Sequence, residues 1–174
     1  MAIAKKRPLK DIVYQVEAPM DRPIIIITAL ALLILFLPAI LTFNENKTAG
    51  TIWFIFATLL SLVMYLIVPR KIIVTSEELV LRSPLFDRKI KRKEILAVQL
   101  LSKKDEAGMW RICASGGFFG CYGIFFSKKH SWLYVYASRS KSFVLIATTR
   151  KKYVISPLNT EIMSILNSQT QEKI

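Results

Sequence analysis

Few side chains in this sequence carry groups that could catalyse a reaction or bind a metal. The softest potential ligands are Cys113, Cys121 and His130, which follow one another at spacings of eight and nine residues. Structural zinc sites usually draw ligands in pairs roughly two to four residues apart, so this spacing matches no usual zinc pattern. The sequence holds one His, so histidine chemistry would depend on His130 alone. We therefore predict no metal site and no cofactor.

A nucleophilic triad is the next chemistry to consider. Ser115, His130 and Asp105 have the required side chains, but nothing around Ser115 resembles a nucleophile elbow or a similar context. No pair of carboxylates lies close to a base in the sequence either. We expect that the protein is not an enzyme.

A dense basic run is the first candidate for binding rather than catalysis. It consists of Arg88, Lys89, Lys91, Arg92 and Lys93. In a strand, alternate side chains share a face, so the two arginines would lie opposite the three lysines. Basic side chains close to an anionic leaflet each contribute about 1 kcal/mol to binding. Lysines on an edge strand also prevent sheet-to-sheet aggregation, so a lipid contact and a solvated edge are both open interpretations.

A tract rich in glycine and aromatic residues is the second candidate. Five of the six glycines lie between residues 108 and 123, among several phenylalanines. The tract has neither G-x-G-x-x-G before a helix nor a G-K-[ST] ending, which disfavours a phosphate-binding loop. Glycine permits tight turns and positive φ, so we predict an extended insertion between strands. Its aromatic side chains either fill or cover the domain, or they enter a membrane interface, in which case the residues are Phe118, Phe119, Phe125 and Phe126, with Lys128 and Lys129 adjacent.

The composition combines two properties that rarely coexist in one soluble domain. The 174 residues are 53% hydrophobic and carry a net charge of +13. Residues 23–69 contain one Lys and one Glu, whereas residues 70–174 contain 19 of the 25 basic residues and 8 acidic ones, a net charge of +11. Apolar and charged residues are thus segregated along the chain. This pattern predicts a membrane protein with a basic soluble domain.

Two uncharged runs are long enough to cross a bilayer. Residues 23–43 comprise 21 residues, about 32 Å of helix against a hydrocarbon core of about 30 Å. Residues 50–69 form the second run, with Trp53 and Tyr65 placed as interfacial anchors near its ends. A buried helix pair is disfavoured because a soluble domain of 105 residues (70–174) could not enclose it. A cleaved signal peptide is disfavoured by the length of the first run, the missing cleavage motif and the second run.

The charges beside the two runs predict their orientation. Lys5, Lys6, Arg7, Lys10 and Arg22 precede the first run, Arg70 and Lys71 follow the second, and only Lys47 lies between them. Because basic residues are enriched on the cytoplasmic side, we expect an integral protein of the cytoplasmic membrane with both termini in the cytoplasm. The expected organisation is a basic cytoplasmic segment over 1–22, a transmembrane hairpin over 23–69 and a cytoplasmic domain over 70–174.

The sequence pattern of residues 70–174 predicts a series of strands followed by one helix. Strands are expected at 71–75, 79–83, 88–93, 95–101, 132–137, 143–148 and 152–156, and 110–114 is a further candidate. Asn159 is a suitable N-cap for a helix with Ile162, Ile165, Leu166 and Gln169 on one stripe. We predict about seven antiparallel strands in a partly open barrel, capped by the C-terminal helix.

Parts of this domain resemble a known family. The tract LVLRSPLFDRKIKRKEILAV at 79–98 is similar to the opening of bacterial pleckstrin-homology-like (PH-like) domains. SGGFFGCYGIFF at 115–126, WLYVYAS at 132–138, VLIAT at 144–148 and YVISPLNTEIMSIL at 153–166 resemble its later part. The resemblance implies a PH-like barrel, commonly preceded by one or two membrane spans, and no established activity or ligand.

We therefore predict a membrane-anchored PH-like binding or assembly module that contacts anionic membrane lipid, a protein partner or another copy of itself. The alternative is a subunit of a transport or channel assembly, although uncharged spans offer no ion path unless several copies assemble. Nucleic-acid binding is suggested by a pI of about 9.9. It is disfavoured because the cytoplasmic side of membrane proteins normally carries such charge.

Overall fold

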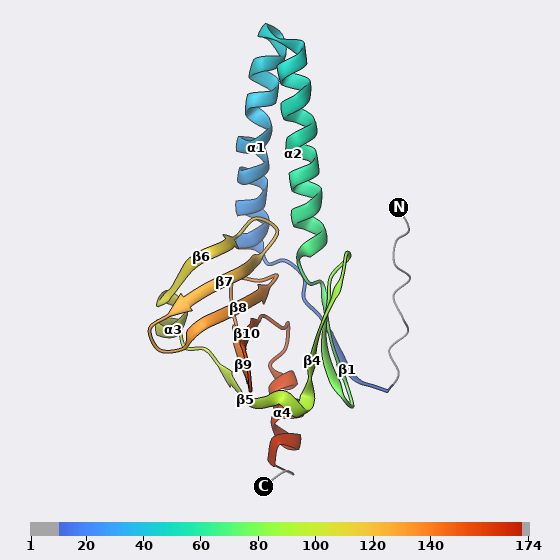
Figure 1. The fold of residues 1–174 in the computed structure, drawn as a ribbon, viewed down its shortest axis with the longest axis vertical. Helices are drawn as coiled ribbons and strands as arrows, with labels where there is room; N and C mark the ends of the chain where they lie inside the picture. Colours follow the sequence, from blue (N-terminus) through green and yellow to red (C-terminus); the bar gives the residue numbers. More distant parts are fainter. Residues whose placement is uncertain (1–10, 172–174) are drawn as a thin grey trace.

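The computed structural model describes residues 11–171, and side chains as far as residue 167. A long helical hairpin stands on a β-rich domain, with a short helix at the opposite end (Figure 1). The basic residues Lys5, Lys6, Arg7 and Lys10, used above to predict orientation, lie outside the described residues, as does the side chain of Gln169.

The hairpin consists of α1 (Arg22–Glu45) and α2 (Lys47–Ile67). Asn46 alone joins them: its N–H donates to the Thr42 carbonyl 2.8 Å away, and its side-chain oxygen accepts from the N–H groups of Thr48 and Ala49. This double cap makes the connection shorter than the six-residue loop (44–49) expected from the sequence. Gly50 permits the close approach, since a Cβ there would lie 2.7 Å from the Phe43 Cα.

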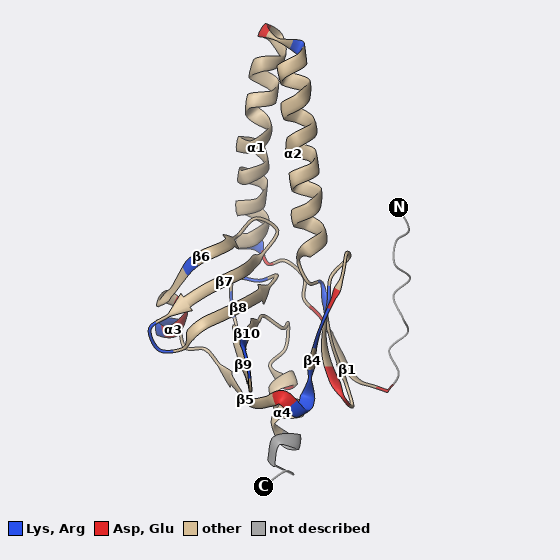
Figure 2. Ribbon diagram, in the orientation of Figure 1, with Lys and Arg blue, Asp and Glu red and all other residues tan. Residues whose placement is uncertain are grey.

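Both helices are long and apolar enough to span a membrane. Their most apolar stretches have mean hydropathies of 3.1 and 2.1 and are only 17% and 11% buried. A core helix of a soluble domain would be mostly buried, so these helices are not part of the domain core. Charged residues are confined to the two ends of the hairpin (Figure 2).

The domain contains two sheets. In the first, all neighbours are antiparallel and the order is β1 (Ile12–Glu17), β2 (Lys71–Thr75), β3 (Glu78–Arg82) and β4 (Asp87–Lys91). The second has the order β5 (Ile95–Leu100), β9 (Val144–Thr148), β10 (Lys152–Ile155), β8 (Ser131–Ala137), β7 (Cys121–Ser127) and β6 (Met109–Gly116). A 3-10 turn over Arg92–Glu94 joins the sheets, and two helices complete the domain, α3 (Lys103–Ala107) and α4 (Glu161–Gln171).

The strand order corrects the prediction of an antiparallel barrel. The described residues form two separate sheets and no closed barrel. One pairing, between β8 and β10, is parallel. It arises because the β9–β10 hairpin folds back and inserts β10 between β9 and β8. The sequence analysis also missed β1, β7 and α3, and it began the last helix at an Asn159 cap, whereas α4 begins at Glu161.

The core has two parts because the six-stranded sheet is buried on both faces. One cluster lies between the sheets and α4, and it includes Ile72, Val74, Leu79, Leu81, Val144, Ile146, Ile155, Ile162 and Leu166. The other lies on the opposite face of the six-stranded sheet, and it includes Leu101, Phe125, Leu133, Val135, Leu145 and Val154. The consecutive apolar run in β9 follows from this two-sided burial.

Arg92 connects three elements at the end of the domain away from the hairpin. Its guanidinium donates to the Thr75 carbonyl at 2.9 Å and to the Ile165 carbonyl of α4 at 3.1 Å. Burial lowers the pKa of Arg92. The side chain thereby fastens α4 to the four-stranded sheet.

We expect Arg92→Gln to lower the free energy of unfolding by about 2 kcal/mol, because two hydrogen bonds from a charged donor are lost. Lys93→Gln is the matched control, since Lys93 is exposed, and it should change stability by less than about 0.5 kcal/mol. Thermal unfolding of the full chain in detergent, followed by circular dichroism, measures both. Equal effects of the two changes would show that Arg92 does not fasten α4.

Candidate functional site at the helix–domain junction

The base of the hairpin rests on the turn between β6 and β7. We call this contact, with the two connectors beside it, the junction. The Thr28 hydroxyl of α1 donates to the Gly117 carbonyl at 3.0 Å and accepts from the Phe119 N–H at 2.9 Å. Thr28 is only 5% exposed. The hydroxyl of this polar residue in an apolar helix is therefore hydrogen-bonded to the backbone of the turn.

Aromatic and sulfur contacts also hold the hairpin against the domain at the junction. The Phe119 ring meets the Tyr65 ring edge-on, with centroids 5.7 Å apart. The Tyr122 hydroxyl contacts the Met64 sulfur. Gly117 has a φ of +125° and no room for a side chain, because a Cβ would collide with Ile27. The glycine-aromatic tract is therefore the β6–β7 hairpin, and its turn carries Phe118 and Phe119 to the helices.

Both connectors between hairpin and domain are held by hydrogen bonds. Asp21, the N-cap of α1, accepts from the Ser140 N–H at 2.9 Å and the Ser140 hydroxyl at 2.6 Å. Burial raises the pKa of the Asp21 carboxyl, but the bonds from Ser140 and Ile24 and the nearby Arg139 outweigh this effect and hold the pKa below its ordinary value. The Ser83 hydroxyl donates to the Ile67 carbonyl at 2.7 Å at the end of α2. Hydrogen bonds to the domain therefore fix both connectors in place.

Two arginines lie in the junction. The Arg70 guanidinium stacks over the Tyr65 ring, 4.9 Å from its centroid, and burial lowers the pKa of Arg70. Arg139 belongs to the loop that holds Asp21. The sequence analysis used Arg70 only as an orientation signal and did not consider Arg139. Nothing in the local sequence of either residue distinguishes it from an ordinary surface cation.

The predicted basic run lies along β4, the edge strand of the four-stranded sheet. The preceding loop touches α2 through the Leu85 N–H and Leu66 carbonyl, and the run ends beside α4 at Arg92. It therefore leads away from the hairpin along the length of β4 (Figure 2), from Arg88 opposite Leu81 to Arg92 beside α4. Arg88 donates to the Tyr136 hydroxyl at 2.9 Å, and Lys89 pairs with Glu78 at 2.9 Å. Lys91 and Lys93 are exposed.

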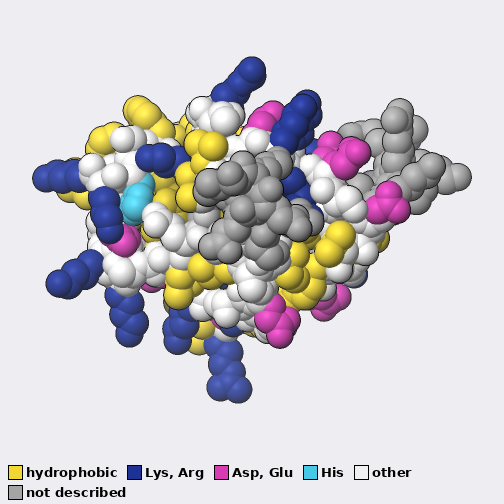
Figure 3. All heavy atoms as spheres, turned by 90° about the horizontal axis from the view of Figure 1, so that it is seen from below, with side chains coloured by type: hydrophobic (Ala, Val, Ile, Leu, Met, Phe, Trp, Pro, Cys, Tyr) yellow, Lys and Arg dark blue, Asp and Glu magenta, His cyan; other side chains and the backbone are white. Residues whose placement is uncertain are grey.

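The other predicted lysines lie elsewhere. Lys128 and Lys129 are in the β7–β8 turn, at the opposite end of β7 from the junction. Lys129 pairs with Asp105 at 3.0 Å, and this bond and one from Ser102 lower the pKa of Asp105 to about 2. Basic side chains project around the rim when the domain is seen from below (Figure 3). The structure thus separates the predicted contact residues among β4, the 3-10 turn after it, the β6–β7 turn, β7 and the β7–β8 turn. In β7, Phe125 is a buried core residue, so the expectation that it enters a membrane interface is wrong.

Of the residues considered for catalysis, His130 and Asp105 lie close together, with Nε2 and Oδ1 3.9 Å apart, but Ser115 does not join them. Ser115 is at the junction end of β6, where its hydroxyl contacts the Phe118 carbonyl at 3.5 Å, whereas His130 is in the β7–β8 turn. Burial lowers the pKa of His130 and raises that of Cys121. Within residues 11–171, no three His, Cys, Asp or Glu side chains group as metal ligands would.

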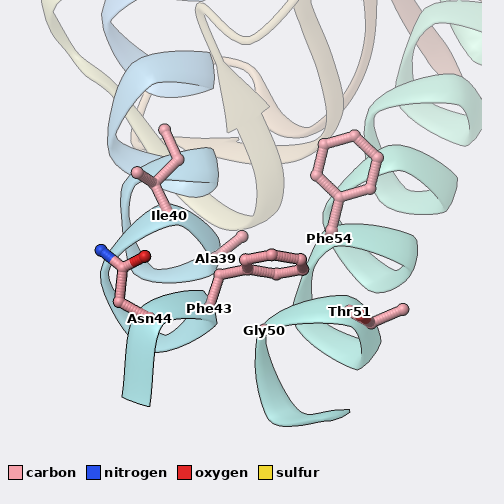
Figure 4. Close-up of a pocket in the computed structure, with 7 residues that line it drawn as sticks. All are labelled: Ala39, Ile40, Phe43, Asn44, Gly50, Thr51 and Phe54. Carbon is pink, nitrogen blue, oxygen red and sulfur yellow. The ribbon is translucent and has the colours of Figure 1, made fainter. Parts of the chain in front are cut away.

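An apolar groove of about 510 Å³ lies at the far end of the hairpin. Its walls come from both helices (Figure 4): Ala39, Ile40, Phe43, Asn44, Gly50, Thr51 and Phe54. Asn44 and Thr51 are the only polar side chains among these lining residues. The groove therefore offers hydrophobic contact rather than recognition of a polar ligand.

Comparison with protein families assigns the domain. The model of the family described as bacterial PH domain matches residues 70–169, which is more than half of the chain. The protein therefore belongs to the bacterial PH domain family, and the resemblance seen in the sequence is confirmed. No curated protein and no solved structure matches the chain. β1 and the helical hairpin precede the matched region.

Thr28→Val should loosen the junction while keeping the shape of the side chain. The Phe119 amide loses its acceptor, so we expect its hydrogen exchange to accelerate about tenfold, the effect of a net loss of about 1.4 kcal/mol. Thr58→Val is the control, because among the described residues the Thr58 hydroxyl bonds only to the Phe54 carbonyl of its own helix. Exchange measured by mass spectrometry on the full chain in detergent tests this. Unchanged exchange in Thr28→Val would mean that Thr28 does not hold the turn.

Proposed function

We propose that α1 and α2 cross the cytoplasmic membrane with both termini in the cytoplasm, and that the PH domain is a binding module held on the inner leaflet, where it contacts anionic lipid. The junction is the observation that carries this proposal. It fixes the domain directly beneath two apolar helices through hydrogen bonds on both connectors. A domain held in this way stays at the leaflet surface at high effective concentration.

The depth of the β6–β7 turn supports a lipid contact. Thr28 lies six residues beyond Arg22, the start of α1, which corresponds to about 9 Å along the helix axis. The polar interface of a bilayer extends roughly 5–8 Å beyond the hydrocarbon core on each side. With Arg22 at the outer edge of the interface, a turn that reaches Thr28 would lie at the boundary between the interface and the hydrocarbon core, with Phe118 and Phe119 near the level where aromatic side chains are favoured.

Electrostatics favours the same leaflet. Arg22, Arg70 and Lys71 flank the hairpin at its domain end, against Lys47 at its tip, as the positive-inside rule requires of a cytoplasmic domain. The attraction of each basic residue to anionic lipid falls off within about a Debye length, roughly 8–10 Å. Basic residues at the junction therefore matter more than Lys91 and Lys93, which lie toward α4.

A row of exposed aromatic residues favours protein binding as a second candidate function. Trp110, Phe126 and Trp132 are neighbours across β6, β7 and β8, and the two tryptophans are 67% and 54% exposed. Exposed tryptophans are enriched at protein interfaces. Self-association has to overcome the net charge of +11 (19 basic and 8 acidic residues) over 70–174. A role in a transport assembly would require several copies, and we assign the protein no catalytic role.

The orientation can be tested with reporter fusions. A reporter that is active only outside the cytoplasm should give signal when fused at Thr48 and none when fused after Ile174. A reporter that is active only in the cytoplasm should give the reverse pattern and serves as the control. Signal from the first reporter at Ile174 alone would overturn the proposed orientation.

Lipid preference can be tested on the full chain. Purified in a mild detergent and offered equal amounts of phosphatidylglycerol and phosphatidylcholine, the protein should retain the acidic lipid preferentially in native mass spectrometry. The physical reason is the attraction between the basic domain and the anionic headgroup. Equal retention of the two lipids would contradict lipid binding and leave the tryptophan row as the favoured contact.

A further inference from the structure

Several buried donors at the junction have no acceptor. The Nε and Nη2 atoms of Arg70, the Nε and Nη1 atoms of Arg139 and the hydroxyl of Ser138 are buried and have no hydrogen-bond partner within residues 11–171. Ser138 is only 1% exposed. Buried polar groups are normally satisfied, and an unsatisfied charged group is costly. These five atoms therefore indicate a ligand of complementary chemistry.

The segments that carry these donors adjoin one another. The Ala18 N–H donates to the Arg70 carbonyl at 2.8 Å, so the two connectors of the hairpin run side by side. Gly120 is in contact with both Val68 and Ser138, since a Cβ placed on it would lie 3.0 Å and 3.4 Å from their atoms. Arg70 and Arg139 are thus carried by neighbouring segments beneath the helices.

The described acidic side chains do not balance these cations. Arg70 forms no salt bridge within residues 11–171, and its guanidinium contacts the Tyr65 ring instead. Glu17 pairs with Lys71 at 3.4 Å. Asp21 lies close enough to Arg139 for its pKa to be lowered, but its two oxygens already accept from Ser140 and Ile24. An additional anion would supply both the charge and the acceptor oxygens.

The position of the two arginines relative to the ends of α1 and α2 indicates which anion they would bind. Arg70 follows the end of α2 by three residues, and Asp21, which lies close to Arg139, immediately precedes α1. If the helices cross the membrane, both arginines lie where the helices leave the bilayer and where phospholipid phosphates are concentrated. Guanidinium groups are suited to phosphate because their planar donors match its oxygens in pairs.

We propose that Arg70 and Arg139, with the Ser138 hydroxyl, bind the phosphate group of an anionic phospholipid of the inner leaflet. This inference rests on the proposed function and deepens it, since it assigns the lipid contact to a defined site rather than to net charge. The anion would lie between the hairpin and the loop after β8. It would link the lipid to the contacts that hold the domain in place.

The test compares two pairs of substitutions that remove the same charge. Arg70→Gln with Arg139→Gln removes the site, whereas Lys91→Gln with Lys93→Gln removes two exposed cations of β4 and its following turn. Each full chain is offered phosphatidylglycerol and phosphatidylcholine in detergent and measured by native mass spectrometry. We expect the arginine pair to reduce the preference for the acidic lipid at least about tenfold, because charge-assisted hydrogen bonds are lost. The lysine pair should leave the preference nearly unchanged.

Each outcome is informative. If both pairs of substitutions reduce the preference for the acidic lipid equally, or if neither pair reduces it, the proposed Arg70–Arg139 site is contradicted. The proposal that the protein binds acidic lipid would still stand. The absence of any preference in the unaltered chain would instead contradict the proposed function itself. Displacement of the lipid by millimolar inorganic phosphate would show that the site binds free phosphate rather than a lipid headgroup, and would overturn the lipid assignment.

A second measurement uses the unaltered protein and does not depend on the variants folding. Hydrogen exchange over residues 136–141 should slow when phosphatidylglycerol is added and stay constant with phosphatidylcholine or with inorganic phosphate. Exchange that responds equally to both lipids, or to neither, would overturn the proposed site.

Discussion

The pairing of β1 with β2 is the constraint on which the rest of the structure depends. These antiparallel neighbours are joined by the entire helical hairpin, so α1 and α2 take the place of an ordinary β-turn. Paired strands lie about 4.8 Å apart, which forces the two ends of the hairpin to leave the domain together. The Glu17–Lys71 pair closes the base at 3.4 Å. The hairpin is therefore attached to the domain through a hydrogen-bonded pair of strands rather than through a flexible linker.

The junction solves a problem that this arrangement creates. A turn placed against apolar helices has backbone groups that need partners, because irregular backbone is not tolerated unsatisfied in an apolar environment. The Gly117 N–H donates to the Gly120 carbonyl across the turn at 2.9 Å, and Thr28 satisfies the Gly117 carbonyl and the Phe119 N–H. One hydroxyl acting as donor and acceptor explains a buried polar residue within α1. The close approach of the turn to α1 also accounts for glycine at 117, where a side chain would collide with Ile27.

The sequence predicted those elements whose apolar pattern is local. The two helices, the strands from β2 to β5 and the strands from β8 to β10 follow from uncharged runs, alternation and turn residues. β7 was missed because its glycine at 123 suggested a loop, although the strand pairs on both sides. β1 was missed because its pattern is mixed and its partner β2 lies beyond the hairpin. The two-sheet arrangement and the Arg70–Arg139 region depend on contacts between distant segments, which no local pattern reports.

Arg70 and Arg139 occupy a different environment from the exposed lysines of this domain, and the difference follows from the chemistry of the two side chains. The lysines of β4 and the β7–β8 turn project into solvent, where a strongly hydrated ammonium is stable and keeps sheet edges apart. Arg70 and Arg139 instead have buried nitrogen atoms beneath the helices, where a weakly hydrated guanidinium tolerates stacking on an aromatic ring. Net charge therefore measures little of what the domain can recognise. In the proposed function, the position of each cation relative to the ends of α1 and α2 would decide whether it meets water or a phosphate.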